Sequence, residues 1–228
     1  MEHLLKVIGH IHTDFPTKFG IPRQSGLVEE LEAKVVFLPE YSREEAFRGL
    51  EGYSHVWLIW QFSEAVRDDW SPTVRPPRLG GNKRMGVFAT RSPYRPNPLG
   101  LSCVKLLGVE IDPVHGTVLR IGGADLMDGT PIYDVKPYLP FADSKTDATG
   151  GFAEEKFDYA LKVILPDNLA AKVPENKRNA LVKLLSEDPR PSYQENAERV
   201  YGFYFGRQEI FFKVDNGVLT VTEIKNAK

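Results

Sequence analysis

The sequence predicts a mainly β N-terminal domain with an antiparallel, barrel-like sheet, followed by a small α+β domain. Residues 1–142 contain many short apolar segments of strand length with few helices between them, and the strand–helix alternation of a doubly wound fold is missing. A polar, glycine-ended stretch over residues 143–151 is the best linker candidate. Residues 152–228 combine one helix with short strands, and a chain of 228 residues is long enough for a medium domain plus a small one.

The expected strands of the first domain follow one another closely along the chain. They cover residues 4–11, 33–38, 53–62, 86–90, 101–109, 117–121 and, more weakly, 132–135. Residues 53–62 are nearly all apolar or aromatic, which predicts a strand that is buried on both faces. One helix is expected over residues 42–50, because Ser42 is a plausible N-cap and Glu45 completes a capping box.

The second domain is expected to hold a helix over residues 174–186, with Pro174 at its first position. Its apolar stripe consists of Ala180, Leu181, Leu184 and Leu185. The prolines of residues 188–191 end this helix. Strands follow over residues 200–205, 209–214 and 218–224, and the sequence Asn-Gly at positions 216–217 predicts a hairpin between the last two.

Composition excludes several classes of protein. A single cysteine, Cys103, rules out an intrachain disulfide and a paired-cysteine metal site. No apolar run approaches the roughly 20 residues of a membrane helix, and the first residues do not resemble a signal peptide. We therefore expect a cytoplasmic protein without membrane contact. His10 and His12 lie two apart but have no evident third ligand, so no metal site is expected.

The charge is unevenly distributed. Residues 71–105 contain no acid and carry +7, which leaves −9 for the rest of a chain whose net charge is −2. A basic patch on an acidic body steers polyanions such as nucleic acid, although a merely solvated basic loop is the alternative. The basic residues are Arg75, Arg78, Lys83, Arg84, Arg91, Arg95 and Lys105.

Two loops could present polar side chains to a ligand. Residues 91–102 contain three prolines and Gly100, which predicts a stiff loop that holds Arg91, Arg95 and Asn97 in a preset geometry. Arginine forks suit phosphates and carboxylates. Residues 20–26 are flanked by glycines and offer Arg23 and Gln24. For both segments the alternative is an ordinary surface turn.

Two further segments carry ionisable residues. His55 begins an apolar strand, where a structural histidine is the commoner finding. Asp128-Gly129 is a turn signal whose backbone can approach a ligand closely, or an ordinary hairpin turn. Asp134, Lys136 and Tyr138 follow shortly after it. Glycine fingerprints of nucleotide-binding folds and the nucleophile elbow of hydrolases are both missing from the sequence.

In these four segments, and in the same order, the chain resembles the TrmO family of tRNA methyltransferases, also called TsaA-like or YaeB-type. The matching text is Pro22-Arg23-Gln24, residues 49–57, the proline loop over residues 91–102, Asp128-Gly129-Thr130-Pro131 and residues 134–138. Together these segments span about the first 140 residues, and the proline loop with Asp-Gly-Thr-Pro is the most specific part. Residues 188–191 with Tyr193 also resemble the C-terminal domain of the bacterial branch.

This resemblance implies a single-sheet, barrel-like methyltransferase that is unrelated to the doubly wound methyltransferases. The cofactor would be S-adenosylmethionine and the substrate tRNA with N6-threonylcarbamoyladenosine (t6A) at position 37, which would become its N6-methyl derivative (m6t6A). The enzyme would be a homodimer. By analogy with the family, the cofactor contacts would be Pro22, Arg23, Gln24, His55, Val56, Arg91, Leu101, Asp128, Gly129, Thr130 and Pro131.

Asp134, Lys136 and Tyr138 are our hypothesised catalytic, substrate-side residues. The anticodon stem-loop would be held by Arg75, Arg78, Lys83, Arg84, Arg95 and Asn97. Two other functions remain open: a non-catalytic RNA-binding module with a β-barrel fold, and a methyltransferase that acts on a different small substrate.

Overall fold

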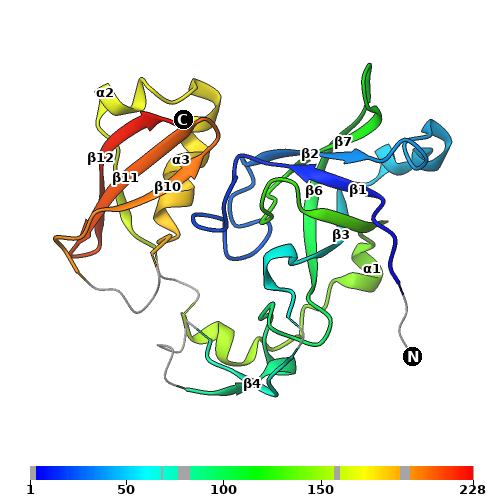
Figure 1. Ribbon diagram of the computed structural model, residues 1–228, viewed down its shortest axis with the longest axis horizontal. Coiled ribbons are helices and arrows are strands. Elements are labelled where there is room, and N and C mark those ends of the chain that lie inside the picture. The colour runs from blue at the N-terminus through cyan, green and yellow to red at the C-terminus, as the bar shows by residue number, and fades with distance from the viewer. Residues whose placement is uncertain (1–3, 68, 77–82, 157–159, 191–195, 228) are drawn as a thin grey trace.

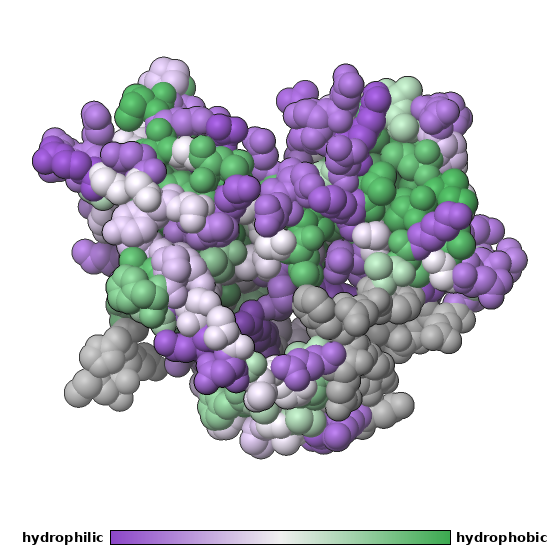
Figure 2. All heavy atoms as spheres, turned by 180° about the vertical axis from the view of Figure 1, so that it is seen from behind, coloured by the Kyte–Doolittle hydropathy of each residue, from purple (hydrophilic) through white to green (hydrophobic). Residues whose placement is uncertain are grey.

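The computed structural model describes residues 4–67, 69–76, 83–156, 160–190 and 196–227. Arg78 and Tyr193, which the sequence analysis singled out, lie outside these ranges. Figure 1 shows two lobes, one built from the strands of the N-terminal part and the other from the sheet and helices of the C-terminal part. Figure 2 shows a notch between the two lobes at the top and a hollow beneath it.

Six antiparallel strands form the N-terminal sheet in the order β1-β2-β7-β6-β3-β8. They are β1 (Gly9–His12), β2 (Glu32–Phe37), β3 (His55–Gln61), β6 (Leu99–Asp112), β7 (Gly116–Gly122) and β8 (Pro131–Pro137). β8 returns to β1 through only two residue pairs, so the barrel closes over a short contact. The mainly β, barrel-like fold predicted from the sequence is confirmed.

The barrel encloses its own apolar core, and β3 shows how the sequence builds it. Val56, Leu58 and Trp60 alternate along β3 and are buried inside the barrel. The residues between them are only half-buried on the outer face. The expectation that this strand is buried on both faces is therefore wrong, because no layer within the described ranges covers its outer side to the same extent.

Three other expectations for this domain differ from the structure. Residues 42–50 form no α-helix: two 3-10 turns, Glu44–Phe47 and Leu50–Gly52, are separated by Gly49 at φ +87°. Ser42 donates to the Pro39 carbonyl instead of capping a helix. Residues 86–90 hold only the end of a short strand, β5 (Met85–Gly86), which pairs with β4 (Thr73–Val74) before a 3-10 turn at Val87–Ala89. The strand expected over residues 4–11 begins only at Gly9.

The C-terminal lobe is a four-stranded sheet in the order β10-β11-β12-β9. Its elements are β9 (Lys162–Ile164), α2 (Asp167–Ala170), α3 (Glu175–Ser186), β10 (Tyr201–Phe205), β11 (Gln208–Asp215) and β12 (Val218–Asn226), after α1 (Pro140–Asp143) and a 3-10 turn at Gly151–Lys156. The apolar stripe of α3 is buried as predicted, although Pro174 occupies the N-cap. Asn216 and Gly217 have positive φ, as the predicted hairpin requires. The sequence analysis missed β9 and α2.

The segment between β1 and β2, residues 13–31, joins the two lobes and is called the bridging segment below. Phe15, Val28 and Leu31 from this segment belong to the apolar core of the C-terminal lobe. Gly20 lies so close to Phe203 of β10 that a Cβ atom there would be 2.3 Å from the ring. The core of the C-terminal lobe therefore includes a part of the chain that precedes most of the barrel.

Candidate active site

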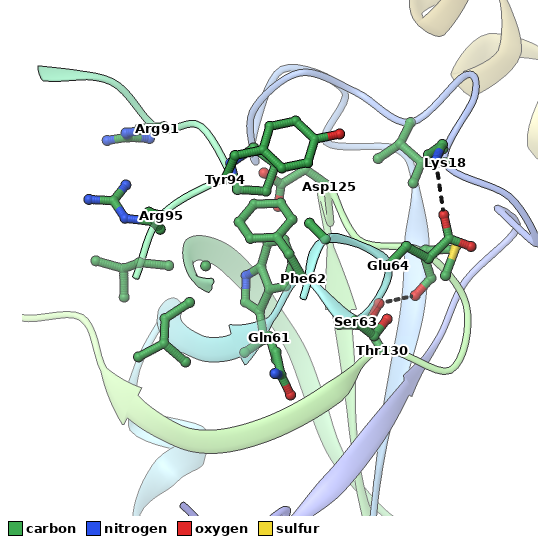
Figure 3. Close-up of a pocket in the computed structure, with 18 of the residues that line it drawn as sticks. Lys18, Gln61, Phe62, Ser63, Glu64, Arg91, Tyr94, Arg95, Asp125 and Thr130 are labelled. Atoms are coloured by element: carbon green, nitrogen blue, oxygen red, sulfur yellow. Dashed lines mark hydrogen bonds and ion pairs between the residues drawn. The ribbon is translucent and has the colours of Figure 1, made fainter. Parts of the chain in front are cut away.

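A pocket of about 850 Å³ opens where β3 ends and β6 begins. It is enclosed by the bridging segment, the turn after β3, the proline loop and the segment before β8 (Figure 3). The residues used below are Lys18, Pro22, Arg23, Gln24, Trp60, Phe62, Glu64, Phe88, Arg91, Tyr94, Arg95, Asn97, Leu101, Asp125 and Thr130. Pockets of this size hold ligands as large as a nucleoside with a substituent.

The proline loop brings its arginines to one side of this pocket, as Figure 3 shows for Arg91 and Arg95. Arg91 donates through Nη1 to Oε1 of Gln24, so two segments that are 67 residues apart in sequence meet here. Arg95 is fixed by the bond from Nη1 to the Thr90 carbonyl at 3.1 Å. These bonds agree with the expected preset geometry of the loop.

The floor of the pocket is a hydrogen-bonded chain from the barrel core. Trp60 Nε1 donates to Ser102 Oγ at 2.9 Å, and Ser102 Oγ donates to Asp125 Oδ1 at 2.6 Å. Gly100 makes this arrangement possible, since a Cβ atom there would lie 2.2 Å from Cε2 of Trp60. Burial raises the pKa of the Asp125 carboxyl, while bonds from Ser102 and the backbone, together with the nearby positive charge of Arg91, act in the opposite direction.

Aromatic rings and an ion pair complete the walls. The Phe62 ring packs 4.2 Å from that of Trp60, and Arg67 lies 4.1 Å over the ring of Tyr94. On the side of the pocket away from the arginines, Lys18 pairs with Glu64 at 3.4 Å (Figure 3). Aromatic faces stack nucleobases, and guanidinium groups bind carboxylates and phosphates, so the pocket suits an anionic nucleoside-like ligand.

The predicted cofactor residues divide into two groups. Six of them line the pocket: Pro22, Arg23, Gln24, Arg91, Leu101 and Thr130. The Val56 side chain is part of the barrel core, and His55 lies at the opposite end of β3, where its Nδ1 is 2.9 Å from Ser54 Oγ. The pocket lining also does not include Asp128, Gly129 and Pro131.

The Asp128-Gly129 turn is held by backbone hydrogen bonds, two of which run to β1 and the residues that follow it. Gly129 has φ +76°, as the turn signal predicts. The N–H groups of Asp128, Gly129 and Thr130 donate to the carbonyls of Phe15, Ile11 and Met127, respectively. The Asp128 carboxylate accepts from the Thr13 N–H at 3.0 Å and lies 3.3 Å from Nδ1 of His12. These three backbone donors are thus occupied within the protein.

The three hypothesised catalytic residues share a different surface. Asp134 and Lys136 form an ion pair of 2.9 Å on β8, opposite Ile59 and Trp57 of β3. Tyr138 packs against the rings of Trp57 and His55. None of the three lines the pocket.

The expected RNA-binding residues are also distributed. Arg95 and Asn97 line the pocket, whereas Arg75, Lys83 and Arg84 are exposed beside β4 and β5. Arg84 donates to Thr73 Oγ1 at 3.0 Å, across the two strands. Arg78 lies outside the described residues. Lys105, from the same basic window, pairs with Glu29 at 3.5 Å.

The sequence did not predict the series of hydrogen bonds Trp60–Ser102–Asp125 or the aromatic wall around Phe62 and Tyr94. The signal for Ser102 was a hydroxyl residue at an inward-facing position of a strand, where a buried polar group needs a partner. Within the described ranges, no three histidine, cysteine, aspartate or glutamate side chains are grouped to hold a metal. No helix in the described part of the chain is long and apolar enough to cross a bilayer.

Comparison with known proteins gives consistent matches over nearly the whole chain. Residues 10–144 match the tRNA-methyltransferase O N-terminal domain, and residues 158–227 match the TrmO C-terminal domain. The tRNA (adenine(37)-N6)-methyltransferase of Escherichia coli (strain K12) is 40% identical over 197 residues, which cover 84% of this chain and 83% of the relative. The enzyme of the same name from Eikenella corrodens is 44% identical over 173 residues, which are 75% of this chain and 97% of the relative.

A protein of Pseudomonas aeruginosa named as a putative S-adenosylmethionine-dependent methyltransferase, RcsF, is 39% identical over 209 residues, or 85% of this chain and 84% of the relative. The crystal structure of TrmO from P. aeruginosa superposes with a TM-score of 0.81 at 32% identity and covers 100% of this chain and 98% of that one. The barrel, the pocket and these matches together define an S-adenosylmethionine-dependent tRNA methyltransferase that does not use a doubly wound fold. The chain belongs to the TrmO family, the tRNA (adenine-N6)-methyltransferases of this class.

Proposed function

We propose that the protein methylates N6 of t6A at position 37 of tRNA and so forms m6t6A. The observation that carries this proposal is the pocket itself, in which arginines, a glutamine and aromatic rings converge, together with the exposed basic residues that flank β4 and β5. The names of the relatives place their reaction at N6 of adenine 37. The threonylcarbamoyl group is the finer part of the proposal and follows from the family resemblance.

The residues of the pocket fit S-adenosylmethionine chemically. Within the described part of the chain, Arg23 and Arg91 each keep donors beyond their bonds to the Asp188 carbonyl and Gln24, and a guanidinium pairs with a methionine carboxylate through charge-assisted bonds. Tyr94, Phe62 and Phe88 offer ring faces to adenine. The cofactor supplies a methyl group on a positively charged sulfur, which adenine N6 must approach in line at roughly 3–3.5 Å.

The substrate also needs a cationic partner for the carboxylate of its threonyl group. Arg95 lines the pocket and is fixed by the Thr90 carbonyl, whereas Lys136 is paired with Asp134 on the outer face of β8. The structure therefore favours Arg95 for this role within one copy of the chain. A substrate that reaches the outer face of β8 would meet Lys136, Asp134 and Tyr138.

A homodimer would explain why the predicted site residues lie on two surfaces. The outer faces of β3, β6 and β8 carry His55, Tyr138 and a half-exposed apolar group that includes Ile59 and Leu101, the latter 56% exposed. Unpartnered apolar side chains beside functional residues mark an interface. We propose that this face packs against a second copy, and size-exclusion chromatography with light scattering tests it. A monomer at micromolar concentration would contradict this part of the proposal.

The reaction is tested by incubating the protein with S-adenosylmethionine and tRNA that carries t6A, followed by mass analysis of nucleosides. We expect m6t6A to appear, and no methylation of the same tRNA without the threonylcarbamoyl group. Arg95→Ala should raise the tRNA KM more than Lys136→Ala does. Binding of S-adenosylhomocysteine without any product would favour another substrate, and no cofactor binding at all would favour the RNA-binding module.

The proposal includes two further expectations from the sequence. We keep residues 1–142 and 152–228 as the two domains, joined by residues 143–151. We also place the reaction in the cytoplasm, because the tRNA substrate is found there and because a chain with one cysteine has no need of an oxidising compartment.

A further inference from the structure

The pocket contains one partly buried carboxylate that neither the family resemblance nor the proposed contacts use. Asp125 lines the pocket, and Ser102 donates to its Oδ1 at 2.6 Å. Indole N–H groups can only donate, so Ser102 Oγ accepts from Trp60 and must direct its own proton to Asp125. The bond from Ser102 thereby fixes the orientation of this carboxylate and acts to lower its pKa, against the larger upward effect of burial.

Methylation of N6 in the substrate requires a group that accepts the N6–H proton. Adenine N6 is a poor nucleophile because its lone pair is delocalised into the ring. Acylation by a carbamoyl group weakens the nucleophile further but makes the N–H more acidic. A group that removes this proton during methyl transfer therefore gives a larger advantage here than at an ordinary amine.

Asp125 is the side chain in the pocket that best meets this need. Among the described residues that line the pocket, the acidic ones are Glu64 and Asp125, and there is no histidine. Glu64 is half exposed at the rim and is paired with Lys18. Asp125 is more deeply placed, and burial moves its pKa upward from that of an ordinary aspartate, which makes it a stronger proton acceptor when it is ionised.

We propose that Asp125 accepts the N6 proton of the target nucleotide during methyl transfer, an inference that rests on the function proposed above. The N6 lone pair forms the new bond to the methyl carbon as the carbon–sulfur bond breaks and leaves its electron pair on sulfur. The N6–H proton passes to a carboxylate oxygen of Asp125. The positive charge on sulfur and the negative charge on Asp125 are both lost, so atoms and charges balance, and the proton then leaves to solvent through the pocket.

The test compares Asp125→Asn, Asp125→Glu and Ser102→Ala with the wild type in single-turnover reactions across pH. The wild-type rate should fall at low pH as Asp125 becomes protonated. Asp125→Asn should be about 10²- to 10⁴-fold slower and should lack this acidic limb. Asp125→Glu should retain part of the rate. Asp215→Asn, at the exposed end of β11, is the matched control and should behave as the wild type.

The pH profile of Ser102→Ala separates a proton-accepting role of Asp125 from a purely structural one, because a structural role would leave the acidic limb where it is in the wild type. Loss of the Ser102 bond removes an interaction that lowers the pKa of Asp125. The acidic limb should therefore move to higher pH. The pKa of Asp125, measured in the cofactor-free protein by carboxyl carbon NMR, should move in the same direction.

Binding measurements separate chemistry from folding. The Kd values for S-adenosylhomocysteine and for tRNA should stay close to those of the wild type in Asp125→Asn. An Asp125→Asn variant with the wild-type rate and pH profile overturns the inference and leaves the proposed function intact. If Asp125→Asn does not fold, an unmoved acidic limb in Ser102→Ala overturns it. A wild-type protein that forms no m6t6A overturns the proposed function itself.

Discussion

Close packing at single residues gives the pocket floor its shape. Gly100 is buried against the Trp60 ring, where a Cβ atom would lie 2.2 Å from Cε2. Gly100→Ala must push the indole aside and strain its bond to Ser102. We expect a loss of about 1–3 kcal/mol in the free energy of unfolding and slower methyl transfer, measured by thermal denaturation and single-turnover assay. Gly52→Ala, with no atom within 4 Å of the added Cβ, is the control and should change neither.

The sequence singled out individual residues where residue type and local backbone carry the signal. Arg91, Arg23 and Gln24 are arginine and glutamine side chains in stiff or glycine-flanked loops, and all three line the pocket. Asp125, which we propose as the proton acceptor, carries no such local signal, because partial burial and a partner 23 residues away distinguish it. Which residues a barrel encloses depends on strand register, and periodicity alone does not determine register.

Among the elements, the β4–β5 pair is flanked by exposed residues of the basic window. Arg75 and Lys83 are exposed there, and each phosphate contact releases a counterion from the nucleic acid. Lys83→Glu should raise the tRNA KM and lower the slope of log Kd against log salt by about 1, with S-adenosylhomocysteine binding unchanged. Lys34→Glu, an equal charge change on the outside of β2, is the control. An unchanged slope in Lys83→Glu would remove these strands from the RNA interface.

Helices and strands with a long apolar pattern were predicted reliably, whereas short helices and strands were predicted poorly. β2, β6, β7, α3 and the β11–β12 hairpin appear where the sequence places them, because each buries a regular apolar face. The helix expected over residues 42–50 failed, since Gly49 takes a left-handed conformation and only Phe47 and the partly buried Leu50 of that segment pack in the described core. β9 was missed because three residues give no detectable period.

At the scale of the whole molecule, the C-terminal lobe supports the loop that carries Arg23 and Gln24. The bridging segment is fixed at both ends: Lys177 of α3 contacts both carboxylate oxygens of Asp14 at 2.6 Å, and Lys183 pairs with Glu30. Between these points Arg23 itself donates to the Asp188 carbonyl at 3.0 Å. No local sequence pattern predicts this arrangement, because it joins residues that are more than 150 positions apart.

This support should be measurable as an effect on cofactor affinity. Lys177→Met breaks the bond to Asp14 and leaves the pocket residues unchanged. We expect the Kd for S-adenosylhomocysteine to rise roughly fivefold, which corresponds to about 1 kcal/mol for a partly exposed ion pair. Calorimetric titration measures it. Lys213→Met, which loses an exposed pair with Glu198 on the same lobe, is the control and should bind normally. A lower Tm in Lys177→Met with an unchanged Kd would mean that the lobe stabilises the chain without positioning Arg23 and Gln24.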